Sequence, residues 1–218
     1  MSVDIKKSYP ILKCSHKKDI LTCASIIRAG GVAVFPTDTV YGVGCTPYNA
    51  RSVERILEIK GRRDGKPLPV IASSVRDIQK IARLGKVGML LAQNYWPGAL
   101  TIISPLRENT LSQLITAGKD SIAVRIPGNN CVLSLLKYCK YLVGTSANLS
   151  ATAAPKSSSE VLTSSFSGFD ALLDDGETEY ARESTIIDLT AGKVKLVREG
   201  AIESAKIFKL IKEAWSSE

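Results

Sequence analysis

The sequence predicts an α/β protein whose sheet contains both parallel and antiparallel strands. Short apolar runs rich in β-branched residues alternate with segments of helical periodicity from residue 16 to residue 214. This alternation is typical of βαβ units, in which a helix connects two parallel strands. Two late apolar runs, 184–190 and 194–198, flank Gly192-Lys193 and predict an antiparallel hairpin. The expected fold class is therefore α/β with a mixed sheet and flanking helices.

The first third of the chain predicts a helix, a buried strand and a second helix. Apolar residues recur at helical spacing in segment 16–29. Residues 32–35 form a short apolar run between two glycines and Pro36, which cannot donate a hydrogen bond to a sheet. Asn49 can cap the following helix, which Gly61 ends.

The middle of the chain repeats the alternation. Residues 68–72 resemble a strand, and Ser74 can cap the helix that follows. A helix is expected near 87–95, closed by the turn Pro97-Gly98, and a strand over 99–104.

The remaining elements continue the same pattern. Residues 121–127 and 141–143 predict strands on either side of a helix near 131–139. Segment 151–168 is rich in small polar residues and predicts a loop with at most one short helix. Its length fits a flap over a site as well as a plain surface excursion. The last helix is expected over 207–214.

Length and composition place bounds on domain organisation and location. No linker-like segment divides the 218 residues, so one domain over 1–218 is expected. The 29 Lys and Arg residues outnumber the 21 Asp and Glu residues, and this net charge of +8 favours polyanionic partners such as nucleotides or RNA. No apolar run reaches the roughly 18 residues of a membrane span, and no signal peptide is evident. A cytoplasmic protein without membrane association is expected.

The cysteines and the single histidine exclude several kinds of site. The five cysteines form no C-x-x-C pair, and several lie among apolar neighbours, which predicts reduced, buried thiols. Because His16 is the only histidine, neither a His/Cys metal site nor a Ser-His-Asp triad is expected.

Polar residues cluster where the predicted strands end. They are three hydroxyls, one amide and several cations: Thr39, Ser146, Ser184, Asn148, Lys60, Arg62, Lys66, Arg125, Arg198 and, in segment 151–168, Lys156. Such a set is poor in nucleophiles and general bases. It suits catalysis by positioning reactants and neutralising charge, as in phosphoryl and nucleotidyl transfer.

Two members of this set have an ordinary alternative. The basic stretch 60–67 is either a phosphate clamp made of side chains or a charged surface turn, and it does not match a Walker A loop. Arg125 either binds a carboxylate bidentately or is a surface arginine.

Six sequence motifs together resemble the YrdC-type family, the L-threonylcarbamoyladenylate synthases. In chain order they are Pro36-Thr37-Asp38-Thr39-Val40-Tyr41-Gly42, Lys60-Gly61-Arg62, Ala123-Val124-Arg125-Ile126-Pro127, Ser146-Ala147-Asn148, Ser184-Thr185-Ile186-Ile187-Asp188-Leu189-Thr190 and Leu196-Val197-Arg198-Glu199-Gly200-Ala201-Ile202. The resemblance covers residues 30–202, and six motifs in the family's order make it specific. The chain departs from the family at Ile71, where many members have a histidine, and it resembles the short, single-domain form.

The resemblance implies a fold, a reaction and a set of site residues. The implied fold is a twisted sheet curved around a basic, concave pocket. The implied reaction converts L-threonine, bicarbonate and ATP into threonylcarbamoyl-AMP and pyrophosphate, the first step of tRNA threonylcarbamoyladenosine modification. The residues implied for L-threonine are Thr39, Arg125, Ser146 and Ser184, with Arg125 on its carboxylate. Those implied for ATP are Arg62, Lys66, Ser121, Asn148, Lys156 and Arg198, with Lys60 and Arg62 as the catalytic pair.

The resemblance also implies partners. Mg²⁺ would arrive with ATP rather than occupy a protein metal site, and the adenylate would pass to a tRNA threonylcarbamoyl-transferase complex. The alternative function is a double-stranded RNA or tRNA-binding module of the same fold without catalysis, and weak RNA binding beside catalysis is also open. An aromatic-interleaved basic stripe, which would favour the RNA-binding alternative, is not found in the sequence.

Overall fold

The computed structural model describes residues 9–61, 66–107 and 110–216. The strands are β1 (Ile11–Lys13), β2 (Ala33–Phe35), β3 (Gly42–Gly44), β4 (Val70–Ala72), β5 (Leu100–Pro105), β6 (Ser121–Arg125), β7 (Tyr141–Val143), β8 (Thr145–Ser146), β9 (Ala171–Asp174), β10 (Thr185–Asp188) and β11 (Lys195–Arg198). The helices are α1 (Lys17–Arg28), α2 (Ala50–Ile59), α3 (Val75–Ile81), α4 (Gly85–Tyr95), α5 (Gln113–Thr116), α6 (Asn130–Cys139), α7 (Ser158–Thr163) and α8 (Ser204–Trp215). No helix of the described residues combines the length and the apolar character needed to cross a membrane.

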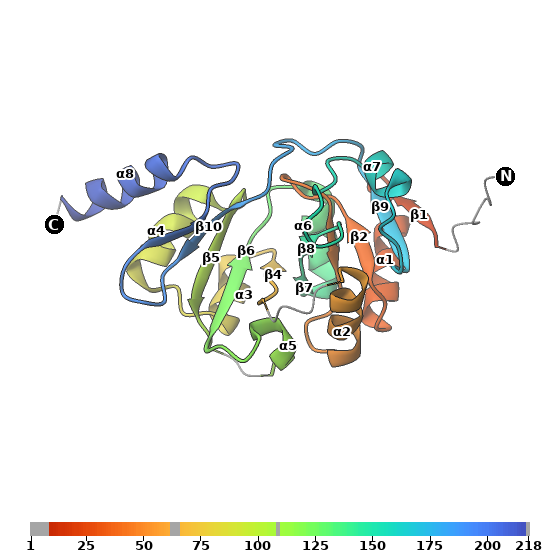
Figure 1. Cartoon of the computed structure of the whole chain (residues 1–218), viewed down its shortest axis with the longest axis horizontal. Coiled ribbons are helices and arrows are strands. Elements are labelled where there is room, and N and C mark those ends of the chain that lie inside the picture. Colours follow the sequence, from red (N-terminus) through yellow and green to blue (C-terminus); the bar gives the residue numbers. More distant parts are fainter. Residues whose placement is uncertain (1–8, 62–65, 108–109, 217–218) are drawn as a thin grey trace.

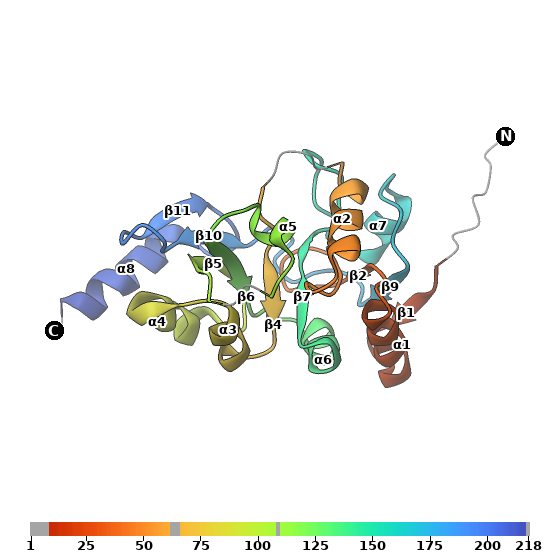
Figure 2. The same ribbon diagram turned by 90° about the horizontal axis from the view of Figure 1, so that it is seen from below.

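The strands form two mixed sheets that lie side by side (Figure 1). The first has the order β1-β9-β2-β3-β8, with β1, β9 and β2 parallel and β3 antiparallel to both of its neighbours. The second has the order β11-β10-β5-β6-β4-β7, in which β10 pairs parallel with β5, and β4 pairs parallel with β6. Helices α1, α3, α4 and α6 lie along one side of the sheets (Figure 2). The predicted α/β class with mixed strand directions is confirmed, and so is the antiparallel β10–β11 hairpin.

The two sheets meet at β3 and β7, where the backbones approach closely. The Val143 N–H donates to the Cys45 carbonyl at 2.9 Å. A Cβ atom at position 44 would lie 1.9 Å from the Val143 carbonyl oxygen, so only glycine fits there. The chain then passes from β7 in the second sheet, through Gly144, to β8 in the first. This crossing fixes the polar ends of both sheets relative to each other.

Local capping explains why several helices begin where the sequence predicts. The side chains of Asn49 and Ser74 accept hydrogen bonds from the backbone N–H groups of Ser52 and Asp77. In segment 151–168 the short helix α7 is capped by Ser157. That segment is also tied down, because the carbonyls of its Pro155 and Lys156 accept from the N–H groups of Tyr41 and Thr178 at 2.8 Å.

Four short strands are not predicted from the sequence: β1, β3, β8 and β9. The Gly-Val-Gly sequence of residues 42–44 has low strand propensity. The pairing of this segment between β2 and β8 overrides that propensity. Strands β1 and β9 have three and four residues, too few to show an alternating pattern.

The expectation of reduced thiols is wrong for two cysteines. Cys14 and Cys131 form a disulfide across 117 positions of sequence, while Cys23, Cys45 and Cys139 are free. Sequence spacing could not reveal the pair, because helix α1 and the end of β1 are brought against α6 only by tertiary packing. Burial raises the pKa of the Cys23 and Cys45 thiols to about 12, which keeps them protonated.

Removal of the disulfide is expected to lower the free energy of unfolding by about 5 kcal/mol. The estimate follows from the chain entropy released when a loop of this length is opened. The measurement is urea unfolding of the Cys14→Ser/Cys131→Ser variant beside the oxidised wild type, with Cys139→Ser as the matched control. Equal midpoints for the double variant and the oxidised wild type would contradict the expectation.

Candidate functional site

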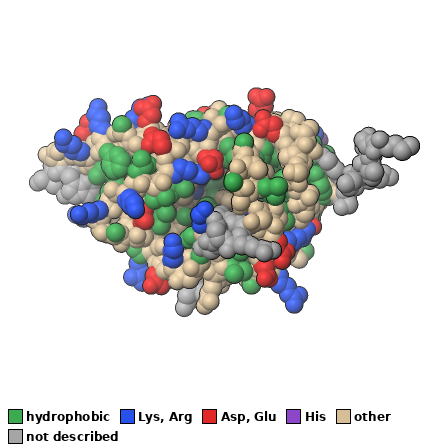
Figure 3. Space-filling model, in the orientation of Figure 1, with side chains coloured by type: hydrophobic (Ala, Val, Ile, Leu, Met, Phe, Trp, Pro, Cys, Tyr) green, Lys and Arg blue, Asp and Glu red, His purple; other side chains and the backbone are tan. Residues whose placement is uncertain are grey.

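A cavity of about 170 Å³ lies where the two sheets meet. Its lining comes from β2 and the loop after it, from β4, β5 and β6, from the β7–β8 crossing and from the β10–β11 hairpin. Its polar lining residues are Thr37, Thr39, Thr101, Arg125, Thr145, Ser146, Glu183, Ser184 and Arg198. The space-filling view shows this face hollowed at its centre, with basic and acidic side chains around the hollow (Figure 3). All four residues predicted to bind L-threonine line the cavity: Thr39, Arg125, Ser146 and Ser184.

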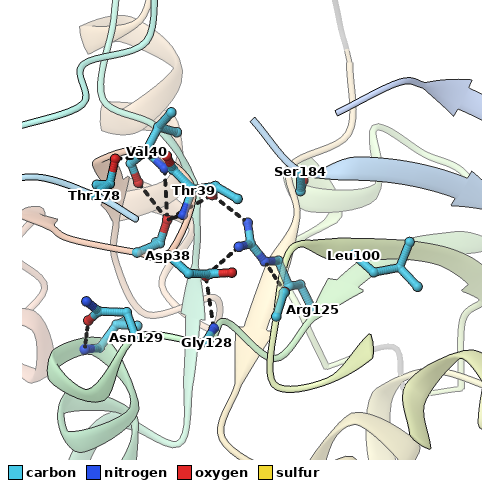
Figure 4. Close-up of polar contacts among 12 residues, drawn as sticks. Asp38, Thr39, Val40, Leu100, Arg125, Gly128, Asn129, Thr178 and Ser184 are labelled. Atoms are coloured by element: carbon cyan, nitrogen blue, oxygen red, sulfur yellow. Dashed lines mark hydrogen bonds and ion pairs between the residues drawn. The ribbon is translucent and has the colours of Figure 1, made fainter. Parts of the chain in front are cut away.

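Arg125 is the central cation of the cavity (Figure 4). It ends strand β6, and its side chain is 8% exposed. Its Nε donates to the Gly98 carbonyl at 2.9 Å, and its Nη1 donates to the Thr39 hydroxyl at 2.9 Å. A third hydrogen bond goes from Nη2 to Asp38. Because a guanidinium has five N–H groups, these three bonds leave two N–H groups that can donate to a ligand.

Asp38 is the buried counter-ion of Arg125. Its Oδ1 accepts from Arg125 Nη2 at 2.5 Å and from the Gly128 N–H at 2.9 Å. Its Oδ2 is buried and has no hydrogen-bond partner among the described residues. Burial lowers the pKa of the Arg125 guanidinium, and the negative charge of Asp38 opposes this effect. Asp38 therefore fixes the orientation of Arg125 and favours its charged form.

The opposite wall contains a second polar group at the start of β10. The Ser184 hydroxyl lies 2.8 Å from that of Thr101, which belongs to the adjacent strand β5. Arg198 Nε donates to the Ser184 carbonyl at 3.1 Å, and its Nη2 donates to the Ser184 hydroxyl at 3.3 Å. Arg198 Nη1 also forms an ion pair with Glu183 at 2.8 Å. The predicted positive charge of the cavity is therefore partly balanced by Glu183 on this side and by Asp38 on the other.

Lys60 holds the segment that contains Ser146 and Asn148. Its ammonium group donates to the Ser146 carbonyl at 2.5 Å, to the Asn148 carbonyl at 2.9 Å and to the Asn148 side-chain oxygen at 3.3 Å. Lys60 is 4% exposed, so its charge is buried against these oxygens. Lys60 thus links the end of α2 to the segment 146–148, and its hydrogen bonds hold this wall of the cavity in place.

Other predicted ATP residues are not gathered around this cavity. Ser121 begins β6 and Arg125 ends it, which separates them by about 13 Å along the strand. Lys156 and Lys66 are exposed, although the neighbouring Pro67 lines the cavity. Asn148 lines a smaller cavity of about 110 Å³ beside α7. Arg62 lies outside the described residues.

Among the polar residues at the site, Thr101, Glu183 and the Arg125 counter-ion Asp38 were not singled out by sequence reasoning. Thr101 is an ordinary position within a predicted strand, and nothing local marks it. Asp38 lies inside the Pro36–Gly42 motif, and Glu183 directly precedes the motif that begins at Ser184. For Asp38 and Glu183, the position inside or beside a motif is the signal that could have identified them. Ile71, at the family's histidine position, is 3% exposed and lines the cavity as an apolar wall.

The site as described is suited to a small ligand with an anionic group. It contains hydroxyls and two arginines, and the described residues include no group of three or more His, Cys, Asp or Glu that could hold a metal ion. Such a site binds and orients reactants and stabilises negative charge rather than supplying a nucleophile.

The fold and the site define an α/β protein with two mixed sheets and an anion-binding cavity at their junction. A family model of the Sua5/YciO/YrdC proteins, described as "Telomere recombination", matches residues 25–200. The chain belongs to this family.

Two curated relatives have the name threonylcarbamoyl-AMP synthase. The protein of Pyrococcus abyssi (strain GE5 / Orsay) is 35% identical over 196 residues, which are 89% of this chain and 57% of the relative. The protein of Bacillus subtilis (strain 168) is 31% identical over 195 residues, which are 88% of this chain and 56% of the relative. The chain thus spans just over half the length of these relatives.

Solved structures show the same fold. Sua5 of P. abyssi complexed with L-threonine is 33% identical, with a TM-score of 0.86 and coverage of 90% of this chain and 58% of that chain. YciO of E. coli is 25% identical, with a TM-score of 0.82 and coverage of 93% of this chain and 99% of that chain. The fold of this chain is therefore that of the family.

Proposed function

We propose that the protein is a threonylcarbamoyl-AMP synthase, which converts L-threonine, bicarbonate and ATP into threonylcarbamoyl-AMP and pyrophosphate. The observation that supports this most strongly is the cavity at the sheet junction, in which the four residues predicted for threonine lie together. The two named relatives and the Sua5 structure with bound L-threonine support the same assignment. The comparisons do not favour an RNA-binding module without catalysis.

In this proposal the amino acid occupies the cavity and ATP lies beside it. The carboxylate of L-threonine binds Arg125, which Asp38 holds in place, and Thr39, Ser146 and Ser184 contact the rest of the molecule. Arg198, at the rim of the same cavity, faces the triphosphate. The remaining ATP residues proposed are Arg62, Lys66, Ser121, Asn148 and Lys156, with Lys60 and Arg62 as the catalytic pair.

The proposed reaction fits the chemistry of these groups. The carbamate made from the threonine amine and bicarbonate attacks the α-phosphorus of ATP, and pyrophosphate leaves. Negative charge grows on the phosphate oxygens, and arginines stabilise it without transferring protons. Mg²⁺ enters as part of the MgATP substrate. ATP and tRNA are cytoplasmic reactants, so we place the protein in the cytoplasm and its adenylate with a tRNA threonylcarbamoyl-transferase complex.

Pyrophosphate release is the test of this proposal. We expect purified protein to release pyrophosphate from ATP when L-threonine and bicarbonate are both present. Omission of either should reduce release to the rate of a reaction without protein, because no carbamate is then available to attack ATP. A coupled phosphate assay after pyrophosphatase measures the rate. Equal release with and without L-threonine would contradict the assignment.

A further inference from the structure

One carboxylate at the cavity has no role in the function proposed above. Glu183 is the only acidic residue among the described residues that line the cavity. Its Oε1 lies 2.8 Å from Arg198 Nη1, and the two side chains are 42% and 36% exposed. A carboxylate has about four lone-pair sites, so Glu183 can also accept a donor from a ligand in the cavity.

The backbone around Glu183 is held firmly, which fixes where its side chain starts. The Ala201 N–H donates to the Glu183 carbonyl at 2.8 Å, and the Thr185 N–H donates to the Ala99 carbonyl at 3.0 Å. Gly200 packs so closely that a Cβ atom there would lie 2.3 Å from the carbonyl carbon of Ser184. The Cα–Cβ bond of Glu183 is therefore held in place at the cavity rim.

Glu183 and Arg125 lie at the same end of the second sheet. Glu183 and Ser184 precede β10, and Arg125 ends β6, with β5 between the two strands. Two strand spacings amount to about 9–10 Å. A negative and a positive side chain thus face a small cavity from two sides, an arrangement complementary to the ammonium and carboxylate groups of a free α-amino acid.

We propose that Glu183 binds the ammonium group of the amino acid substrate and thereby couples amino acid binding to nucleotide binding. The inference rests on the proposed function. In the empty site, Glu183 pairs with Arg198 and repels a triphosphate that approaches it. The ammonium group neutralises Glu183 when the amino acid binds, and Arg198 is then released toward the phosphates. Each substrate therefore strengthens the binding of the other.

The experiment measures binding of a non-hydrolysable ATP analogue by calorimetry, with and without saturating L-threonine. For the wild type we expect L-threonine to tighten binding of the analogue by about 5- to 150-fold, the usual range of coupling between two sites. In Glu183→Gln we expect L-threonine affinity to fall, affinity for the analogue alone to rise, and the coupling to fall below about twofold. These opposite changes in affinity distinguish the proposed role from structural damage, because structural damage would lower the affinity for both ligands.

Two controls complete the design. Glu177→Gln removes a carboxylate from the same connecting segment but away from the lining of the cavity, and it should keep the wild-type coupling. 2,3-Dihydroxybutanoate, which has a hydroxyl in place of the amino group, should not strengthen analogue binding to the wild type.

Two results would overturn the inference and can be told apart. If the wild type binds both substrates and releases pyrophosphate, but Glu183→Gln keeps the wild-type coupling, the role of Glu183 is wrong and the enzymatic assignment stands. If the wild type binds neither L-threonine nor the analogue, the proposed function fails, and the inference fails with it.

Discussion

Replacement of Arg125 by alanine is expected to weaken L-threonine binding by about 30- to 4,000-fold. Truncating one member of a buried, hydrogen-bonded charge pair costs about 2–5 kcal/mol, and 1.4 kcal/mol corresponds to a factor of ten. The side chain is 8% exposed and its guanidinium is already oriented by Asp38, Thr39 and Gly98, so little entropy is lost when a carboxylate binds. Calorimetric titration with L-threonine measures the change.

The Arg125→Ala variant has a second expected effect, because it leaves Asp38 buried without a counter-ion. An uncompensated buried charge costs about 3–5 kcal/mol of folding free energy. The double variant Arg125→Met/Asp38→Asn removes both charges, and we expect it to recover most of the lost stability but not the binding. Arg76→Ala, an exposed arginine on α3, is the matched control. Wild-type L-threonine affinity in a folded Arg125 variant would show that the carboxylate binds elsewhere.

Replacement of Lys60 by methionine is expected to lower both the stability and the activity of the protein. Methionine keeps much of the apolar stem but removes the donors that Ser146 and Asn148 use. Leaving buried acceptors unsatisfied costs about 1–3 kcal/mol each, so a total loss of about 2–4 kcal/mol is expected once water reaches some of them. A displacement of about 1 Å in the cavity wall would lower pyrophosphate release by about 100-fold.

Urea unfolding and the pyrophosphate assay measure the two effects of Lys60→Met. Lys119→Met, an exposed lysine outside the cavity, serves as the control and should match the wild type in both. If Lys60→Met unfolds at the same urea concentration as the wild type, the three hydrogen bonds of the Lys60 ammonium group do not stabilise the segment 146–148.

The four residues predicted for threonine illustrate what the sequence could supply. Thr39, Arg125 and Ser146 lie at or after the end of a short apolar run, and Ser184 directly precedes one. The runs predicted the strands, and their ends pointed to the site residues. Their gathering in one cavity needed the order of strands in two sheets, which no local pattern contains. The family resemblance assigned the four residues to one site but did not give the order of the strands.

Features that depend on distant parts of the chain were missed. The Cys14–Cys131 disulfide joins segments 117 positions apart, and β9 is a four-residue strand placed between β1 and β2. Asp38 was visible in its motif, but its role as counter-ion depends on β6 from the other sheet. Tertiary packing determines all three, and local propensity contains no signal for them.

The central claim is that the junction of the two sheets seats a hydroxy amino acid beside a nucleoside triphosphate. The most direct measurement is a crystal structure of the protein with L-threonine and a non-hydrolysable ATP analogue. The account predicts the threonine carboxylate within hydrogen-bonding distance of Arg125, with the α-phosphate facing the amino group and Arg198 near the phosphates. Both ligands bound away from Arg125 and Ser184 would contradict it.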